Sequence, residues 1–203
     1  MTETILWRRI DLPGHEIATL DALNEGWRLS GTAIFLSEHG PSKLNYVVIC
    51  DSSWQTTSAK ISGVVGSEAV NLVVSANAER KWHLNGVECG GVEGCIDIDL
   101  GFSPSTNLLP IRRFALGVGQ EATVTAAWLP FPSLRFELLP QLYRRDTERT
   151  YHYESRYGLF TRTLEVDSTG FVTSYPDLWQ AESTAAGLPA VTLPGRPRRQ
   201  PAG

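Results

Sequence analysis

The sequence contains little cysteine, little lysine, one methionine and no long apolar segment. Its three cysteines, Cys50, Cys89 and Cys95, are odd in number and form no C-x-x-C pair, which argues against a disulfide framework and against a zinc site. No apolar run approaches the roughly 20 residues that a membrane-spanning helix needs. The first residues lack a basic segment followed by an apolar one, so we expect no signal peptide, and a cytoplasmic protein with reduced thiols.

Acidic residues outnumber basic ones over most of the chain. The formal charge is −4 for 203 residues, and residues 183–203 carry three arginines and no acid, which leaves −7 for residues 1–182. Because phosphate binding relies on clustered cations, such a body is a poor surface for nucleic acid, and we expect none as a partner.

Alternating apolar and polar residues predict strands along most of the chain. A turn-forming triplet at 24–26 joins two of them, and Asn85-Gly86 is a strong signal for a tight hairpin. The segment 15–23 also has helix-like spacing, but the adjoining turn favours a strand. The predicted strands cover residues 16–23, 27–36, 44–50, 57–65, 69–76, 81–84, 114–118, 123–128, 134–143, 151–156, 159–166 and 171–175.

These strands have no crossover helices between them, which predicts an all-β, mostly antiparallel domain over residues 1–182. One large sheet would have to bend or roll to cover its apolar side, and any face left uncovered would favour dimerisation. At most two short helices are expected, one after Ser103-Pro104 and one around 176–181. Residues 183–203 lack periodicity and are rich in Pro, Gly and Ala, so we predict a disordered tail there.

Two familiar catalytic patterns occur only in part. Gly117-x-Gly119-x-x-Ala122 has dinucleotide-binding spacing but precedes a β segment, whereas the fingerprint requires a helix. Gly101-x-Ser103 lacks the second glycine of a nucleophile elbow, and Pro104 would remove the N–H of the oxyanion hole. The four histidines are scattered. We therefore expect neither a cofactor nor a metal.

The most informative segment is residues 94–113, GCIDIDLGFSPSTNLLPIRR. In a strand, Asp97 and Asp99 would share one face with Cys95, while four apolar residues would occupy the reverse. Asn107 and the pair Arg112-Arg113 follow closely, and only one of two adjacent arginines in an extended chain can meet the acids. Carboxylates, an amide and a guanidinium this close together predict a polar recognition site.

Asp97 and Asp99 also admit other interpretations. At positions i and i+2 of a strand they stand about 6.6 Å apart, which is compatible with the roughly 6.5–9.5 Å gap of an inverting glycosidase. Catalytic pairs, however, flank a bond from opposite sides. A solvated strand face, or acids neutralised by arginine, is the alternative without a ligand.

A second cluster follows the predicted strand that ends at Cys50. Asp51 is placed either to cap a turn or to lie at the rim of a pocket, with Trp54 as a platform for a sugar ring. Glu137, Gln141 and Tyr143 would share a face if Pro140 does not break their strand.

These signals recur together, in order along the chain, in a known family. The elements are Leu12-Pro13-Gly14-x-Glu16; Gly26-Trp27 and Gly31; Gly40-Pro41 with Leu44-x-Tyr46; Cys50-Asp51-x-x-Trp54; Trp82 with Asn85-Gly86; the run 94–113; Ala126-Ala127-Trp128-Leu129-x-Phe131-Pro132; Gln141-x-Tyr143; Leu164-Glu165-Val166-Asp167; and Tyr175-Pro176-x-x-Trp179. On these motifs, residues 5–180 resemble a bacterial family of glycolipid-binding proteins.

The resemblance implies one strongly bent sheet, a tight homodimer, a remote likeness to lipoprotein carriers, and an acidic pocket for a sugar-bearing lipid. Carried onto this sequence, the implied ligand-binding residues are Asp51, Trp54, Asp97, Asp99, Asn107 and one of Arg112 or Arg113. The function predicted is therefore non-catalytic binding of a glycolipid or related amphiphile. Two alternatives stay open: a hydrolase of a glycan or glycolipid with Asp97 and Asp99 as acid and base, and a dimeric structural or regulatory protein without a small-molecule ligand.

Overall fold

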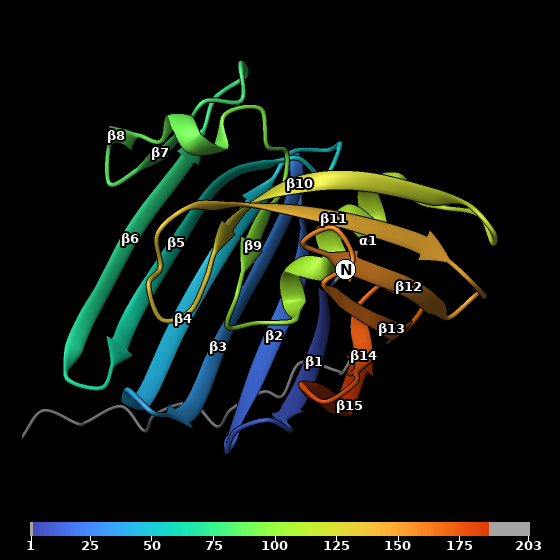
Figure 1. Cartoon of the computed structure of the whole chain (residues 1–203), viewed down its shortest axis with the longest axis horizontal. Coiled ribbons are helices and arrows are strands. Elements are labelled where there is room, and N and C mark those ends of the chain that lie inside the picture. The colour runs from blue at the N-terminus through green and yellow to red at the C-terminus, as the bar shows by residue number, and fades with distance from the viewer. Residues whose placement is uncertain (1, 187–203) are drawn as a thin grey trace, which may run out of the picture.

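One 15-stranded sheet forms almost the whole protein (Figure 1). The computed structural model describes residues 2–186. The strands follow in the order β8-β7-β6-β5-β4-β3-β2-β1-β15-β14-β13-β12-β11-β10-β9, and only the pairing of β9 with β10 is parallel. Their bounds are β1 Thr2–Arg9, β2 Gly14–Leu23, β3 Gly26–Ser37, β4 Gly40–Cys50, β5 Thr56–Val65, β6 Glu68–Ala76, β7 Trp82–Leu84, β8 Val87–Glu88, β9 Ile98–Leu100, β10 Glu121–Leu129, β11 Glu137–Arg145, β12 Thr150–Ser155, β13 Phe160–Val166, β14 Val172–Tyr175 and β15 Trp179–Ala186. The predicted all-β, mostly antiparallel class is confirmed.

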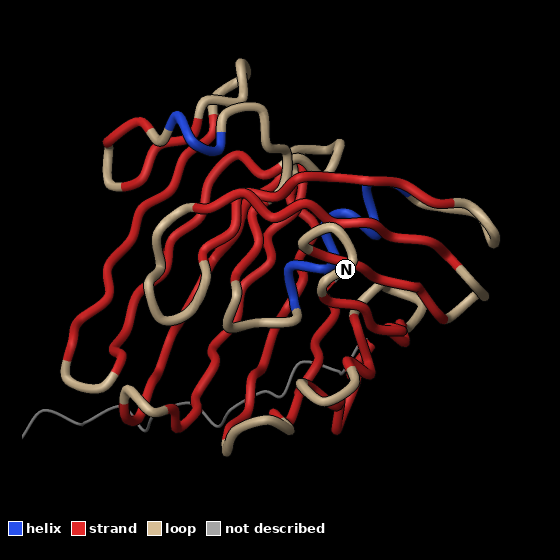
Figure 2. The backbone as a smooth tube through the Cα atoms, viewed as in Figure 1, coloured by secondary structure: helices blue, strands red, loops and turns tan. Residues whose placement is uncertain are grey.

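The sheet curls strongly without closing, as predicted. Strands β1 to β6 form one long wall, and β10 to β13 cross over it (Figures 1 and 2). The curl brings the segment before β9 back to the start of β5, where the Thr56 N–H donates to the Ile96 carbonyl over 3.2 Å and the Ile98 N–H donates to Thr56 Oγ1 over 3.2 Å. The interior between the two walls is where the core and the candidate site lie.

The helical content is small. It consists of the 3₁₀ turns η1 Gly90–Val92 and η2 Ser105–Asn107 and the helix α1 Leu108–Phe114. The expected helical turn after Ser103-Pro104 is therefore present, and Ser103 Oγ accepts the Ser105 N–H over 3.1 Å. No helix among residues 2–186 is long and apolar enough to cross a membrane.

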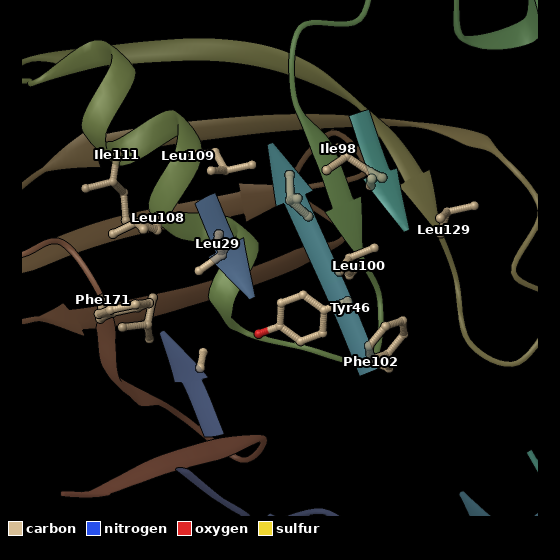
Figure 3. Close-up of a cluster of buried hydrophobic side chains, with 14 of the residues drawn as sticks. Leu29, Tyr46, Ile98, Leu100, Phe102, Leu108, Leu109, Ile111, Leu129 and Phe171 are labelled. Atoms are coloured by element: carbon tan, nitrogen blue, oxygen red, sulfur yellow. The ribbon is translucent and has the colours of Figure 1, made fainter. Parts of the chain in front are cut away.

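The core follows from strand alternation. In β4, Leu44, Tyr46, Val48 and Cys50 are buried while the residues between them are less so. Figure 3 shows side chains of β9 and α1, among them Leu100, Leu108 and Ile111, near Leu29 of β3 and Tyr46 of β4. Burial of this apolar surface stabilises the curl, because each wall covers the apolar face of the other.

Three predictions about elements are wrong. Residues 114–118 form no strand, since Phe114 ends α1 and Ala115 takes a left-handed conformation with φ of 46°. The residues around 176–181 form no helical turn but a tight turn followed by β15. β15 continues to Ala186, so four residues assigned to the disordered tail are in a strand; residues 187–203 lie outside the described part.

Three strands lie outside the predicted ranges: β1, β8 and β15. Of these, β1 and β15 pair with each other in the middle of the sheet. β1 and β15 lie at opposite ends of the chain. No short turn joins them, so no hairpin signal in the sequence predicts their pairing. This pairing joins the N-terminal and C-terminal halves into one sheet.

Candidate ligand-binding site

The segment that the sequence singled out lies inside the curl, so both of its faces are covered. Asp97 is only 1% exposed and forms an ion pair with Arg113, whose Nη2 donates to Oδ2 over 2.5 Å. Burial raises the pKa of the Asp97 carboxyl, and the hydrogen bond and charge of Arg113 oppose that shift. Of the two adjacent arginines, Arg113 is the one that meets an acid.

A third arginine, which sequence reasoning missed, holds this segment in place. Arg80 donates to the carbonyls of Cys95 over 3.0 Å, Thr56 over 2.9 Å and Ile96 over 2.6 Å. These three bonds fix the chain immediately before β9 against the start of β5. They thereby set the positions of Asp97 and Asp99.

Asp99 has a different environment from Asp97. It projects from β9 toward β11, where Gln141 Nε2 donates to its Oδ2 over 2.8 Å and also contacts the Tyr153 hydroxyl at 3.0 Å. Desolvation raises the pKa of Asp99 to about 6, partly offset by the Gln141 bond, while the nearby Asp97 charge raises it further. Among residues 2–186, no hydrogen bond reaches Oδ1 and no cation pairs with this carboxylate.

Asp99 lines a cavity of about 420 Å³ between β9, η2 and strands β10 to β15. This volume falls within the roughly 300–1,000 Å³ of small-molecule sites. The lining residues are Asp99, Leu100, Gly101, Ser103, Pro104, Asn107, Trp128, Leu139, Tyr153, Ser155, Arg156, Leu159, Phe160, Tyr175, Leu178 and Trp179. A few polar groups thus face a mostly apolar and aromatic wall.

Two further polar residues of this cavity have defined partners. Asn107, a predicted site residue, donates from Nδ2 to the Tyr143 hydroxyl over 2.8 Å, which also fixes the amide. The Arg156 guanidinium lies over the Trp128 ring at 4.8 Å. The lining therefore contains one carboxylate and one guanidinium, and the predicted acidic pocket is represented by Asp99 alone.

A buried carboxylate lies behind the cavity. Glu16 is 1% exposed, and its Oε1 accepts the hydroxyls of Tyr46 over 2.6 Å and of Ser103 over 2.5 Å, while its Oε2 has no hydrogen-bond partner in the described part of the chain. Desolvation raises the pKa of Glu16 to about 7 against these two hydrogen bonds and the charge of Arg9. Since Ser103 also lines the cavity, this network connects the β2–β4 wall to the floor of the site.

The remaining predicted residues lie elsewhere. Asp51 caps a turn, because its Oδ1 accepts the N–H groups of Ser53 over 2.9 Å and Gln55 over 3.0 Å. Trp54 stacks on Trp27 with ring centroids 4.4 Å apart, and Arg112 lies over Trp54 at 5.0 Å. Trp54 and Arg112 line a separate groove and do not reach the Asp99 cavity.

The seven predicted residues thus fall into four places. The structure brings Asp99 and Asn107 together in the cavity, pairs Asp97 with Arg113, puts Trp54 beside Arg112, and leaves Asp51 in its turn. Among residues 2–186, no group of three His, Cys, Asp or Glu side chains is arranged to hold a metal.

Strand parity could have found two of the residues that were missed. Glu16 has the parity of the buried Ala18 and Leu20, so it had to face inward. Tyr153 likewise shares the inward parity of Tyr151 in β12. No comparable signal exists for Arg156, which lies in a turn and reaches the cavity only through the curl of the sheet.

The fold and the cavity define a class of protein: one curled, mostly antiparallel sheet whose interior combines a partly buried carboxylate with apolar walls. A family described as "Putative glycolipid-binding" matches residues 4–181, and the chain belongs to this family. A crystal structure of a DUF1089 family protein from Pseudomonas aeruginosa is similar in fold, with a TM-score of 0.72 and 30% identity over 81% of this chain and 91% of that chain. Comparison with curated proteins gives no match.

Proposed function

We propose that the chain binds a glycolipid or related sugar-bearing amphiphile, without catalysis, in the cavity at Asp99. The observation that carries this proposal is a partly buried carboxylate that lies at a cavity and has a free oxygen and no cationic partner within residues 2–186. Sugar hydroxyls are donors suited to such an oxygen, and hydrogen bonds to an ionised acceptor are stronger than neutral ones. The family to which the chain belongs supports this class of ligand.

The aromatic walls suit the ring of a sugar. Trp128 of β10 and Trp179 of β15 line the cavity on the same side of the sheet as Tyr175. An aromatic face matches the apolar C–H side of a sugar ring, while Tyr and Ser hydroxyls around it can bond to the ring's edge. Asp99 and Asn107 would then contact hydroxyl groups of the head.

The alkyl chain would leave along the apolar wall. Leu139, Phe160 and Leu178 line this side, and Leu159 lines the cavity although it is 87% exposed. At the cavity mouth, Leu159 would bury apolar area now exposed to water if an alkyl chain packed against it, and burial of apolar area favours binding. The site therefore offers polar contacts to one end of an amphiphile and apolar contacts to the other.

The hydrolase alternative requires a second catalytic group opposite Asp99. Asp97 is buried against Arg113, and Asp99 is the only carboxylate among the lining residues that the structure describes. We therefore leave Asp97 and Arg113 out of the proposed ligand-binding set and retain Asp99 and Asn107. A structural or regulatory role without a small ligand is the outcome if no amphiphile binds.

Two experiments test the proposal. Mass spectrometry of an organic extract of the purified protein should reveal a bound sugar-bearing lipid. Calorimetric titration with an alkyl glucoside below its micelle concentration should show binding that weakens roughly tenfold or more in Asp99→Asn, since a hydrogen bond to a charged group contributes about 1.5–3 kcal/mol. Asp146→Asn, an exposed carboxylate paired with Arg144, is the matched control. An empty extract together with no alkyl glucoside binding would overturn the proposal.

We also propose that the protein is a homodimer in the cytoplasm. The outer face of β2 to β6 carries exposed Ile17, Ile34, Val47, Val64 and Val73, which supports a covered face in the assembly. The three cysteines are free, which supports a reducing compartment. Sedimentation equilibrium should give twice the mass of 22.4 kDa.

A further inference from the structure

We propose that the groove beside Trp54, at the C-terminal end of α1, binds an anionic group of the phosphate class. The groove measures about 860 Å³ and is separate from the Asp99 cavity, since the two share no lining residue. This inference does not depend on the glycolipid proposal. It rests on three arginines that converge on the groove without carboxylate partners among residues 2–186.

Arg112 is held by aromatic stacking instead of an ion pair. Its guanidinium lies 5.0 Å from the Trp54 ring and 5.9 Å from the Trp27 ring, and the two rings stack on each other at 4.4 Å. A stacked guanidinium stays charged and keeps the N–H groups at its edge available for an acceptor. The stem of Arg112 is packed as well, because a Cβ added at Gly170 would meet Arg112 Cδ at 3.3 Å.

Arg145 is fixed by the backbone around it. It donates to the carbonyls of Leu116 over 2.8 Å, Thr147 over 3.2 Å and Glu148 over 2.7 Å. Carbonyl acceptors orient the guanidinium but do not neutralise it. Arg145 is therefore a preorganised positive charge at the groove.

The net charge of the groove also depends on its third arginine, Arg149, and on its two acidic residues. Arg149 is exposed on the same loop and forms no ion pair among the described residues. Against these three arginines the lining contains Glu148 and Asp167. Asp167 Oδ1 is already occupied, accepting the N–H groups of Thr169 over 2.9 Å and Gly170 over 3.0 Å. The groove is thus locally positive in a chain whose net charge is −4.

The three guanidinium groups indicate which class of ligand fits the groove. Their planar fork of donors matches the oxygens of phosphate bidentately, and arginine is weakly hydrated enough to desolvate for such a contact. Three arginines around one groove suit a group with several acceptor oxygens and more than one negative charge. A phosphate carried by a small soluble molecule and one in a lipid headgroup share this chemistry.

The test uses tryptophan fluorescence, because ligand contacts with Arg112 change the environment of Trp54. Inorganic phosphate and glycerol 3-phosphate are titrated in solution, and flotation measures binding to phosphatidylcholine vesicles with and without phosphatidylglycerol. We expect binding of at least one phosphate probe that weakens as salt is added. Binding of the soluble probes indicates a soluble ligand, and binding only of vesicles that contain phosphatidylglycerol indicates a lipid headgroup.

The variants Arg112→Gln and Arg149→Gln should each weaken that binding roughly tenfold or more, as expected for hydrogen bonds to a charged group. Arg144→Gln, the neighbouring exposed arginine paired with Asp146 outside the groove, should bind as the wild type does. Arg149 is exposed, so its variant carries the test if Arg112→Gln fails to fold. Asp99→Asn should leave phosphate binding unchanged, which separates this proposal from the glycolipid site. Absence of binding to every probe, or equal binding by both arginine variants and the wild type, would overturn the inference.

Discussion

Glu16 and Asp99 are two carboxyl groups inside the curled sheet, Glu16 fully buried and Asp99 partly buried. Burial raises the pKa of Glu16 from 4.5 to about 7 and that of Asp99 from 3.8 to about 6. In both cases the folded state binds a proton more tightly than the unfolded state does. Their contribution to stability is therefore fully present at low pH and is lost as the pH rises through the folded pKa.

The first prediction concerns Glu16. Glu16→Gln should change the free energy of unfolding relative to the wild type, and this change should be more favourable above pH 7 than below pH 4.5 by on the order of 3 kcal/mol. The reason is that the amide of Gln cannot ionise, whereas the buried Glu16 carboxyl must ionise at high pH. Urea unfolding of the wild type and the variant across this pH range measures the difference. Parallel pH profiles for the two proteins would show that Glu16 titrates normally.

The second prediction concerns the buried pair of Asp97 and Arg113. Arg113→Met should destabilise the protein by about 3–5 kcal/mol, since it leaves a carboxylate that is 1% exposed without its partner. The double variant Asp97→Asn with Arg113→Met should recover part of that loss. Strictly additive effects in a double-mutant cycle would mean that the two side chains do not interact.

At the scale of elements, β3 approaches the Tyr46 ring closely at Gly31, and this approach allows Tyr46 to hydrogen-bond to Glu16. A Cβ added at Gly31 would lie 2.6 Å from the Ile17 carbonyl and would also collide with the Tyr46 hydroxyl. That hydroxyl donates to Glu16 and contacts Ser105. The absence of a side chain at residue 31 thus allows the network between the wall and the cavity floor to form.

The third prediction follows from this contact. Gly31→Ala should lower the free energy of unfolding by about 1–3 kcal/mol, the usual cost of overpacking a closely packed site. Gly91→Ala is the control, because nothing lies within 4 Å of a Cβ at that position. Equal stabilities of the two variants, measured by urea denaturation, would contradict the account.

Elements whose signals are local were predictable, and those that depend on distant partners were not. The Asn85-Gly86 turn was predictable because Asn and Gly readily adopt the positive φ that a tight hairpin turn requires. In the structure their φ angles are 51° and 80°. Residues 114–118 were mistaken for a strand because a short apolar run does not distinguish a helix end from a strand. β1 and β15 are far apart in the sequence but pair in the sheet, and no local sequence pattern predicts that pairing.

At the scale of the whole molecule, the strand order and the curl of the sheet together determine which polar residues meet. That Asp99 and Asn107 lie near each other was predictable because they belong to one short segment, and both line the cavity. Trp128 of β10 lies opposite Asp99 in the β9–β10 pair, Tyr153 comes from β12 two strands further along the sheet, and Arg156 follows β12 in a turn. The helix α1 directs the adjacent Arg112 and Arg113 to different places: Arg112 lies over Trp54, and Arg113 pairs with Asp97. Trp54 and Asp99 therefore line different cavities.

The fourth prediction concerns the cavity mouth. Leu159→Asp should weaken alkyl glucoside binding roughly tenfold, since it removes apolar contact area from the proposed path of the chain. Stability should change by less than about 0.5 kcal/mol because the side chain is 87% exposed. Val87→Asp, at an apolar residue 69% exposed on β8, should leave binding unchanged. Wild-type affinity in Leu159→Asp would remove this residue from the ligand path.

The most direct test of a glycolipid site in the curl is photolabelling with a glycolipid that carries a photoreactive group in its sugar head. Mass spectrometry of the labelled peptides would locate the head on the chain. We expect label on the peptides that contain Asp99, Trp128 and Tyr153, competed away by unlabelled alkyl glucoside and diminished in Asp99→Asn. Label confined to the outer face of β2 to β6, or distributed without competition, would contradict a ligand site inside the curl.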